Sequence, residues 1–153
     1  MFKFQTIKWL GVLSGLISFF SEEVDFSLLN QAETIAWISE TIIKENKTLG
    51  EINYIFCSDD YLHKMNVEHL NHDTLTDIIT FNYCVEDIIS SDIFISVDRV
   101  KDNAEIFKTS FEQELNRVMI HGVLHLLGYD DKTDLDKKTM RSKEYFYLTL
   151  LLN

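Results

Sequence analysis

Proline is absent from this chain of 153 residues, and Cys57 and Cys84 are its only cysteines. Without proline the chain has no cis-proline turn or rigid proline-rich linker, and no stretch rich in serine and glycine marks a domain boundary. The two cysteines lie too far apart for a C-x-x-C motif, which excludes a disulfide framework and a redox site of that type. The sequence therefore predicts one continuous domain in a reducing compartment, the cytoplasm.

Positive charge is also scarce: the chain has 14 Lys and Arg residues and 25 Asp and Glu residues, and its formal net charge is −11. This balance excludes a protein that binds nucleic acid by bulk electrostatic attraction. Any contact with nucleic acid must then be local. Hydrophobic residues make up 46% of the chain and charged residues 25%, which excludes a disordered or fibrous chain.

A long hydrophobic run is missing as well. The apolar stretch Trp9–Phe20 is shorter than the ~20 residues of a membrane-spanning helix. Two lysines precede it as in a signal peptide, but Ser21–Glu23 follows without a small-x-small cleavage pattern. We therefore expect no membrane segment, an N-terminal extension over residues 1–16, and a single domain over residues 17–153.

Hydrophobic periodicity predicts a mixture of strands and helices along the chain. Asn30 and Ser58 are the expected helix caps, and runs of β-branched and aromatic residues indicate strands. The predicted strands cover residues 17–20, 52–57, 77–81 and 92–97, and the predicted helices cover residues 31–46, 100–108, 111–127 and 134–152, with one more after Ser58. This order predicts an α+β fold, an α/β sandwich in which helices flank a small mixed central sheet.

The most informative segment runs from His121 to Asp131 and reads HGVLHLLGYDD. Residues i and i+4 share one face of a helix, so His121 and His125 can present two imidazole nitrogens to one ion. Gly128 offers the positive φ that ends the helix, and the reversed chain can bring Asp131 back as a third ligand. Three protein ligands and an open position are typical of a catalytic metal centre, because a structural zinc is normally closed by a fourth side chain.

The motif H-x-x-x-H alone is a weak signal, since two histidines four residues apart are often ordinary surface or half-buried residues. Here the surrounding helix is apolar, and unpaired imidazoles would be costly in it, which favours a metal ion. The spacing of His121, His125, Gly128 and Asp131 parallels the metzincin arrangement. However, Gly122 stands where those peptidases have a catalytic glutamate, so a zincin peptidase is disfavoured.

The same segment resembles the pattern H-G-x-L-H-L-x-G-Y-D-H of the YbeY family and departs from a fixed position only at Asp131. Residues 75–81 and 91–96 are similar to the strands P-T-D-V-L-S-F and G-D/E-I-x-I-S of that family, and Met140 and Glu144 keep its M-x-x-x-E spacing. The resemblance extends from about residue 17 to the C-terminus.

Membership of the YbeY family implies a small sheet flanked by helices, with the metal-binding histidines on a central helix. It implies one divalent metal ion, usually taken to be zinc, and a hydrolase that cleaves single-stranded RNA. It further implies an endoribonuclease of ribosomal RNA maturation, at the 3′ end of 16S rRNA, and of ribosome quality control. The implied partners are ribosomal RNA and the ribosome or its proteins, with no DNA and no membrane.

The chain departs from the family pattern at two places. The family commonly has an arginine implicated in RNA handling shortly before its T-D strand, but residues 69–73 contain none. Asp131 replaces a neutral nitrogen ligand by a charged and harder oxygen, which keeps three ligands and favours harder metals.

Further candidate residues surround the metal motif. Asp77, Asp92 and Asp130 are candidates for a catalytic base or for supporting the ligands, although each also suits a strand end or a turn. Lys137, Lys138 and Arg141 are candidates for binding the substrate, although they equally suit a solvated helix face. Two alternatives to the endoribonuclease stay open: a metallohydrolase of another substrate, and a ribosome-associated binding protein with a structural metal.

We predict that Met1–Gly15 is dispensable, because the family resemblance begins only at about residue 17. A chain that begins at Leu16 should fold and bind as much metal as the full chain, measured by thermal unfolding and elemental analysis. An insoluble or metal-free product would show that the segment belongs to the domain.

Overall fold

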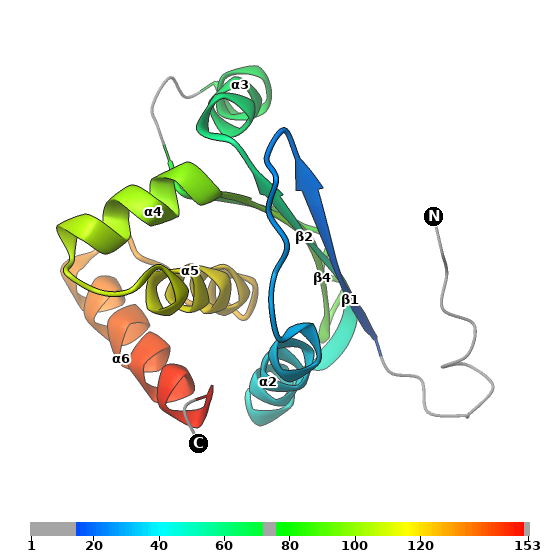
Figure 1. Cartoon of the computed structure of the whole chain (residues 1–153). Helices are drawn as coiled ribbons and strands as arrows, with labels where there is room; N and C mark the ends of the chain where they lie inside the picture. The colour runs from blue at the N-terminus through cyan, green and yellow to red at the C-terminus, as the bar shows by residue number, and fades with distance from the viewer. Residues whose placement is uncertain (1–14, 72–75, 152–153) are drawn as a thin grey trace.

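The computed structural model of the chain describes residues 15–71 and 76–151 and contains a four-stranded sheet (Figure 1). The strand order is β1-β2-β4-β3. The elements follow one another as β1 (Leu16–Glu22), α2 (Gln31–Lys44), β2 (Thr48–Cys57), α3 (Asp59–Leu70), β3 (Ile78–Asn82), β4 (Ile88–Ser96), α4 (Val97–Ile106), α5 (Phe111–Leu126) and α6 (Asp134–Leu151).

The sheet is mixed. β1, β2 and β4 run parallel, whereas β3 pairs antiparallel with β4. Parallel neighbours need a crossover connection, and α2 supplies it between β1 and β2. The predicted α+β class with a small mixed sheet is therefore confirmed. The fold leaves β3 at one edge of the sheet.

The helices form layers on the sheet. Figure 1 shows α5 between the sheet and α6, so α5 is the central helix. Alternate residues of β2 and β4 form one core cluster with α5, which includes Ile52, Tyr54, Phe56, Ile93, Ile95, Val118, Met119 and Val123. On the opposite face, α3 covers a smaller cluster formed by Cys57, Leu62 and Ile79.

A buried hydrogen bond ties the sheet to the central helix. The Tyr54 hydroxyl donates to the Met119 carbonyl at 3.1 Å, and the side chain of Tyr54 is fully buried. A buried phenol needs such a partner, because an unsatisfied polar group inside a core is costly. The bond fixes α5 two residues before His121.

The elements agree with the sequence prediction in kind and differ at their ends. Ser58 caps α3 as predicted, since its hydroxyl accepts a hydrogen bond from the Tyr61 amide. Asn30 precedes α2 as predicted, but it lies in the left-handed region with φ 57° and its side chain makes no capping bond. The strands β2 and β4 begin earlier than predicted, at Thr48 and Ile88, because they pair with each other there.

Part of the sequence prediction falls on residues 1–14, 72–75 and 152–153, which lie outside the described part of the chain. This applies to most of the expected N-terminal extension, to the second half of the stretch that lacks the family's arginine, and to the last residue of the predicted C-terminal helix. Among the helices in the described ranges, none is long and apolar enough to span a membrane.

Gly122 lets the central helix approach the edge strand closely. A Cβ atom at this position would lie 2.8 Å from Ile78 Cδ1 and 3.2 Å from Thr80 Cγ2, both on β3. The first distance is too short for a van der Waals contact between carbon atoms. The small residue after His121 therefore sets how near the two histidines lie to β3.

We predict that Gly122→Val lowers the free energy of unfolding by about 1–3 kcal/mol, because its methyl groups overpack the contact with β3. Gly122→Ala is the matched control and should change stability less, since the helix propensity gained offsets part of the contact. Urea unfolding of the three proteins measures the difference. A valine variant as stable as the parent would show that α5 and β3 separate at little cost.

Candidate metal centre

Three side chains from α5 and the loop after it converge on one point. His121 Nε2 lies 3.0 Å from His125 Nε2 and 3.5 Å from Asp131 Oδ2, and His125 Nε2 lies 3.3 Å from the same oxygen. Across the described ranges, this is the group of three His, Cys, Asp or Glu residues close enough to hold a metal ion. The predicted ligands are thus brought together, and a metal site is possible there.

The distances fit the size of a metal ion. A tetrahedral ion with ligand bonds of about 2.0–2.1 Å separates its ligand atoms by about 3.3 Å. The three distances between the candidate ligand atoms, 3.0, 3.3 and 3.5 Å, lie close to this value. Two ring nitrogens and one carboxylate oxygen form a donor set that suits a divalent transition metal, with one position left for water or substrate.

Glu144 sets the tautomer of His121. Its buried carboxylate accepts a hydrogen bond from His121 Nδ1 at 2.6 Å. The proton is therefore on Nδ1, and Nε2 presents a lone pair toward His125 and Asp131. Burial alone raises the pKa of the Glu144 carboxyl, but the bond from His121 and the charge of Arg117 outweigh it and hold the pKa below its usual value.

Arg117 neutralises two buried carboxylates beside this histidine. Its guanidinium forms two hydrogen bonds to Glu114, at 3.0 and 2.8 Å, and two longer ones to Glu144. The hydrogen bond to Glu114 is the largest of the causes that raise the pKa of Arg117, which stays charged. A buried carboxylate requires such a partner, because an unpaired buried charge is strongly destabilising.

The glycine turn positions the third candidate ligand. Gly128 has φ 106°, as predicted, and its amide donates to the His125 carbonyl. The Tyr129 amide donates to the Leu124 carbonyl, which completes the pattern of a Schellman cap. The chain reverses there, and Asp131 returns toward the two histidines.

A second cluster anchors the same loop to the body of the protein. The Tyr129 hydroxyl donates to Glu45 at 2.7 Å, and Tyr147 and Lys143 on α6 bind the same carboxylate. Burial favours the neutral form of Glu45, but hydrogen bonds from Tyr147, Tyr129 and Lys143 outweigh it and lower the pKa. Glu45, the residue after α2, therefore holds the loop at Tyr129, two residues before Asp131.

A cleft of about 370 Å³ opens beside the three candidate ligands, and we call it the metal cleft. Its other wall comes from β3 and the residues before it: Thr76, Asp77, Ile78, Thr80 and Asn82. Burial raises the pKa of Asp77, although the charges of Arg117 and His121 partly oppose this shift. The metal cleft thus combines a candidate metal group, a carboxyl group of increased basicity, and hydroxyl and amide groups.

The structure separates the other candidate residues. Asp77 lines the metal cleft, whereas Asp130 is exposed in the loop and does not line it. Asp92 lies on the sheet face opposite α5, where it accepts hydrogen bonds from Asn53 and Tyr83. The remaining candidates, Lys137, Lys138 and Arg141, are exposed on α6 and lie outside the metal cleft.

Sequence reasoning missed the residues that support the site from a distance. Arg117 precedes His121 by four residues on the same helix face, which was an available signal. No signal in the sequence indicated Glu45, because its partner Tyr129 lies 84 residues away along the chain. Thr80 and Asn82 also gave no signal, since their place in the cleft depends on the packing of β3 against α5.

Comparison with known proteins gives a consistent result. The family model described as endoribonuclease YbeY matches residues 17–151. Two proteins named endoribonuclease YbeY are similar to the chain over 125 residues: one from Flavobacterium johnsoniae is 60% identical and covers 82% of this chain and 90% of its own, and one from Flavobacterium psychrophilum is 56% identical and covers 82% and 89%. The solution structure of a Thermotoga maritima protein matches with a TM-score of 0.63 and 29% identity over 89% of each chain.

We predict that Asp131→Ala lowers the affinity for a divalent metal by more than about 100-fold, because a direct ligand should matter more than an outer partner does. Asp131→His should preserve binding, since an imidazole restores a third ligand, and Asp130→Ala should lose less. Titration against a competing chelator, with elemental analysis, measures the difference.

The double variant His121→Ala/His125→Ala is the control that should bind no metal at this site. Full metal occupancy in Asp131→Ala would mean that the third ligand lies elsewhere.

Proposed function

The chain belongs to the YbeY endoribonuclease family, and we propose that it is a metal-dependent hydrolase that cleaves single-stranded RNA. The observation that carries the proposal is the group His121, His125 and Asp131 at the open side of the metal cleft. An endoribonuclease hydrolyses internal phosphodiester bonds, and this chemistry needs a site that water and an extended strand can both reach.

Zinc is the ion that we propose for His121, His125 and Asp131. Two imidazoles and one carboxylate with an open position form a set typical of catalytic zinc, and the separations of the three atoms suit bonds of zinc length. When bound, such an ion supplies Lewis acidity to a phosphoryl oxygen and lowers the pKa of water in the cleft.

The side chains of the protein orient the reactants and accept protons. Glu144 keeps His121 in the tautomer that a metal requires. Among the three aspartates indicated by the sequence, Asp77 is the proposed proton acceptor because it alone lines the metal cleft. The Thr80 hydroxyl and the Asn82 amide are placed to bind the sugar or phosphate groups of the substrate.

Single-stranded RNA is the proposed substrate, because a chain with net charge −11 has little means to hold a duplex along its two backbones. Ribosomal RNA is the proposed target, at the 3′ end of 16S rRNA, and the ribosome or its proteins are the proposed partners.

We place the protein in the cytoplasm. The two free cysteines support this compartment, because disulfides are rare there. Burial of the Cys57 thiol, and to a lesser extent the carboxylates near it, raises its pKa to about 12.

A purely structural metal is the main alternative, in a ribosome-associated binding protein. A structural ion is normally enclosed by four side chains, whereas three candidate ligands here lie beside a cleft of about 370 Å³. The open cleft therefore favours catalysis.

We predict that the purified protein cuts an unpaired RNA strand at least about tenfold faster than the same strand in a perfect duplex, because only an unpaired strand can enter the metal cleft. A chelator should abolish cleavage and leave the far-ultraviolet circular dichroism spectrum largely unchanged, since the three candidate ligands are not part of the hydrophobic core cluster. Gel analysis of end-labelled RNA measures the rates.

His121→Ala/His125→Ala is the control for contaminating nuclease and should be inactive. Efficient cleavage of the duplex would contradict the strand preference. Loss of the folded spectrum together with activity on chelation would instead support the structural metal.

A further inference from the structure

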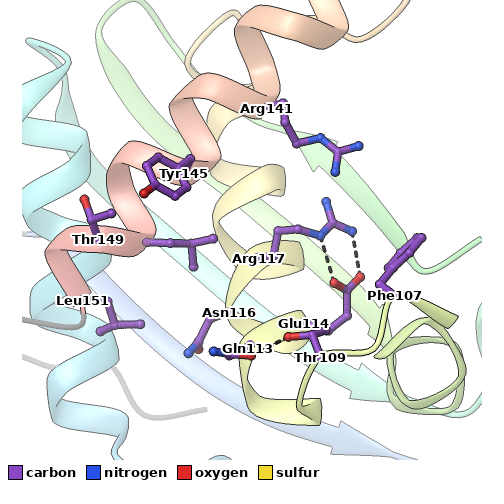
Figure 2. Close-up of a pocket in the computed structure, with 11 residues that line it drawn as sticks. Phe107, Thr109, Gln113, Glu114, Asn116, Arg117, Arg141, Tyr145, Thr149 and Leu151 are labelled. Carbon is purple, nitrogen blue, oxygen red and sulfur yellow. Dashed lines mark hydrogen bonds and ion pairs between the residues drawn. The ribbon is translucent and has the colours of Figure 1, made fainter. Parts of the chain in front are cut away.

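A second pocket, of about 360 Å³, lies between α5 and α6 next to the metal cleft, and we call it the α5–α6 pocket. Figure 2 shows Arg117 and Arg141 extending from the two helices on the same side of the view as Phe107, with Tyr145 and Thr149 on α6 along the rest of the pocket. Its volume lies within the range of small-molecule sites, about 300–1,000 Å³.

One side chain, Arg117, links the α5–α6 pocket to the metal centre. Arg117 lines the pocket, and the same guanidinium lies 4.0 Å from Asp77 in the metal cleft and contacts Glu144, the partner of His121. Arg117 and His121 are four residues apart on α5, about 6 Å along the helix axis. Through Arg117 the α5–α6 pocket therefore lies beside the metal centre.

Arg141 supplies the free positive charge of the pocket. The chain has three arginines, and Arg99 is paired with Asp59 and Asp102 while Arg117 is paired with Glu114 and Glu144. Arg141 makes no ion pair or hydrogen bond with any residue in the described ranges. In a protein of net charge −11, an exposed and unpaired arginine at the rim of a pocket is a local site for an anionic group.

A stripe of side chains on α6 leads into the pocket. Lys137, Arg141, Tyr145 and Thr149 follow one another at intervals of four residues, so they share one face of the helix. The first two residues are cationic, and Tyr145 lines the pocket although the residue is 72% exposed. Cations followed by an exposed aromatic ring are the pattern by which proteins hold a single nucleic acid strand.

We propose that the α5–α6 pocket is a nucleotide subsite, which binds one base of the RNA strand whose phosphodiester lies at the metal centre. In it Tyr145 stacks on the base and Arg141 pairs with the adjacent phosphate. The inference rests on the proposed function, because it assigns the strand to a nuclease substrate.

A base fits this pocket better than a phosphate group does. The lining is largely apolar, with Leu148 and Leu151 among its residues, and the charge of Arg117 is already balanced by two carboxylates. An anion deep in the pocket would meet Glu114, whereas a flat aromatic ring would be desolvated against apolar groups. The phosphate group would instead lie at the exposed rim of the pocket, beside the charge of Arg141.

The test is the affinity for a fluorescein-labelled single-stranded RNA with phosphorothioate linkages that slow cleavage, measured by fluorescence anisotropy. Tyr145→Ala should raise Kd by about 5- to 150-fold, because one stacked base is lost, and Tyr145→Phe should restore binding. Arg141→Ala should weaken binding and reduce the slope of log Kd against log salt by about 0.7, the value for one phosphate contact.

Two controls remove the same groups elsewhere. Phe146→Ala takes away an exposed ring from the neighbouring position of α6, and Lys64→Ala takes away an exposed cation from α3, which lies on the other face of the sheet. Neither should change Kd. An abasic ribose is placed at each position of the RNA in turn. For the parent protein it should raise Kd at one position, and for Tyr145→Ala it should not raise Kd further at that position.

The outcomes separate the subsite from the proposed function. If the parent binds the strand with the predicted dependence on Tyr145 and Arg141 but does not cut ordinary RNA, the subsite stands and the nuclease proposal fails. If the parent cuts RNA and neither replacement changes Kd, the subsite is wrong and the pocket serves another class of partner. If the parent does not bind the strand, both are wrong.

Discussion

Glu144 is a carboxylate buried between α5 and α6, and the arrangement of the site depends on its two contacts. One contact fixes the ring of His121, and the other reaches Arg117, which also neutralises Glu114. A buried carboxylate is tolerated only with such partners, so the packing of α6 on α5 and the orientation of the histidine form together. Arg117 lines the α5–α6 pocket and also lies 4.0 Å from Asp77 of the metal cleft.

The candidate metal centre combines a rigid part with a loop. The histidines belong to a central helix that Tyr54 ties to the sheet and that Gly122 lets approach β3. Asp131 instead belongs to a loop, held at one end by the glycine cap and through Tyr129 by Glu45. Preorganised ligands reduce the ordering cost of binding an ion, because their rotamers are already restricted. The backbone that carries each candidate ligand is therefore held by the rest of the fold.

The sequence predicted those features that depend on neighbours along the chain. The histidine helix, its glycine turn and the existence of the strands follow from periodicity and from local backbone preferences. The order β1-β2-β4-β3 and the Glu45 cluster depend on distant pairs, for which one sequence contains no signal. Asp92 illustrates the limit: its strand was predicted, but register decides which face its side chain takes, and it faces away from the cleft. The left-handed conformation of Asn30 likewise depends on how the chain enters α2.

The position of Asp131 on a loop also bears on how such a centre can diverge. Exchanging a buried residue on α5 would disturb the core around Val118, Met119 and Val123, whereas the Asp131 side chain is about half exposed and contacts the two histidines. A loop position of this kind can therefore carry an imidazole or a carboxylate without repacking the core. At such a position a carboxylate favours harder ions than an imidazole does, so the preference for an ion can change without rebuilding the fold.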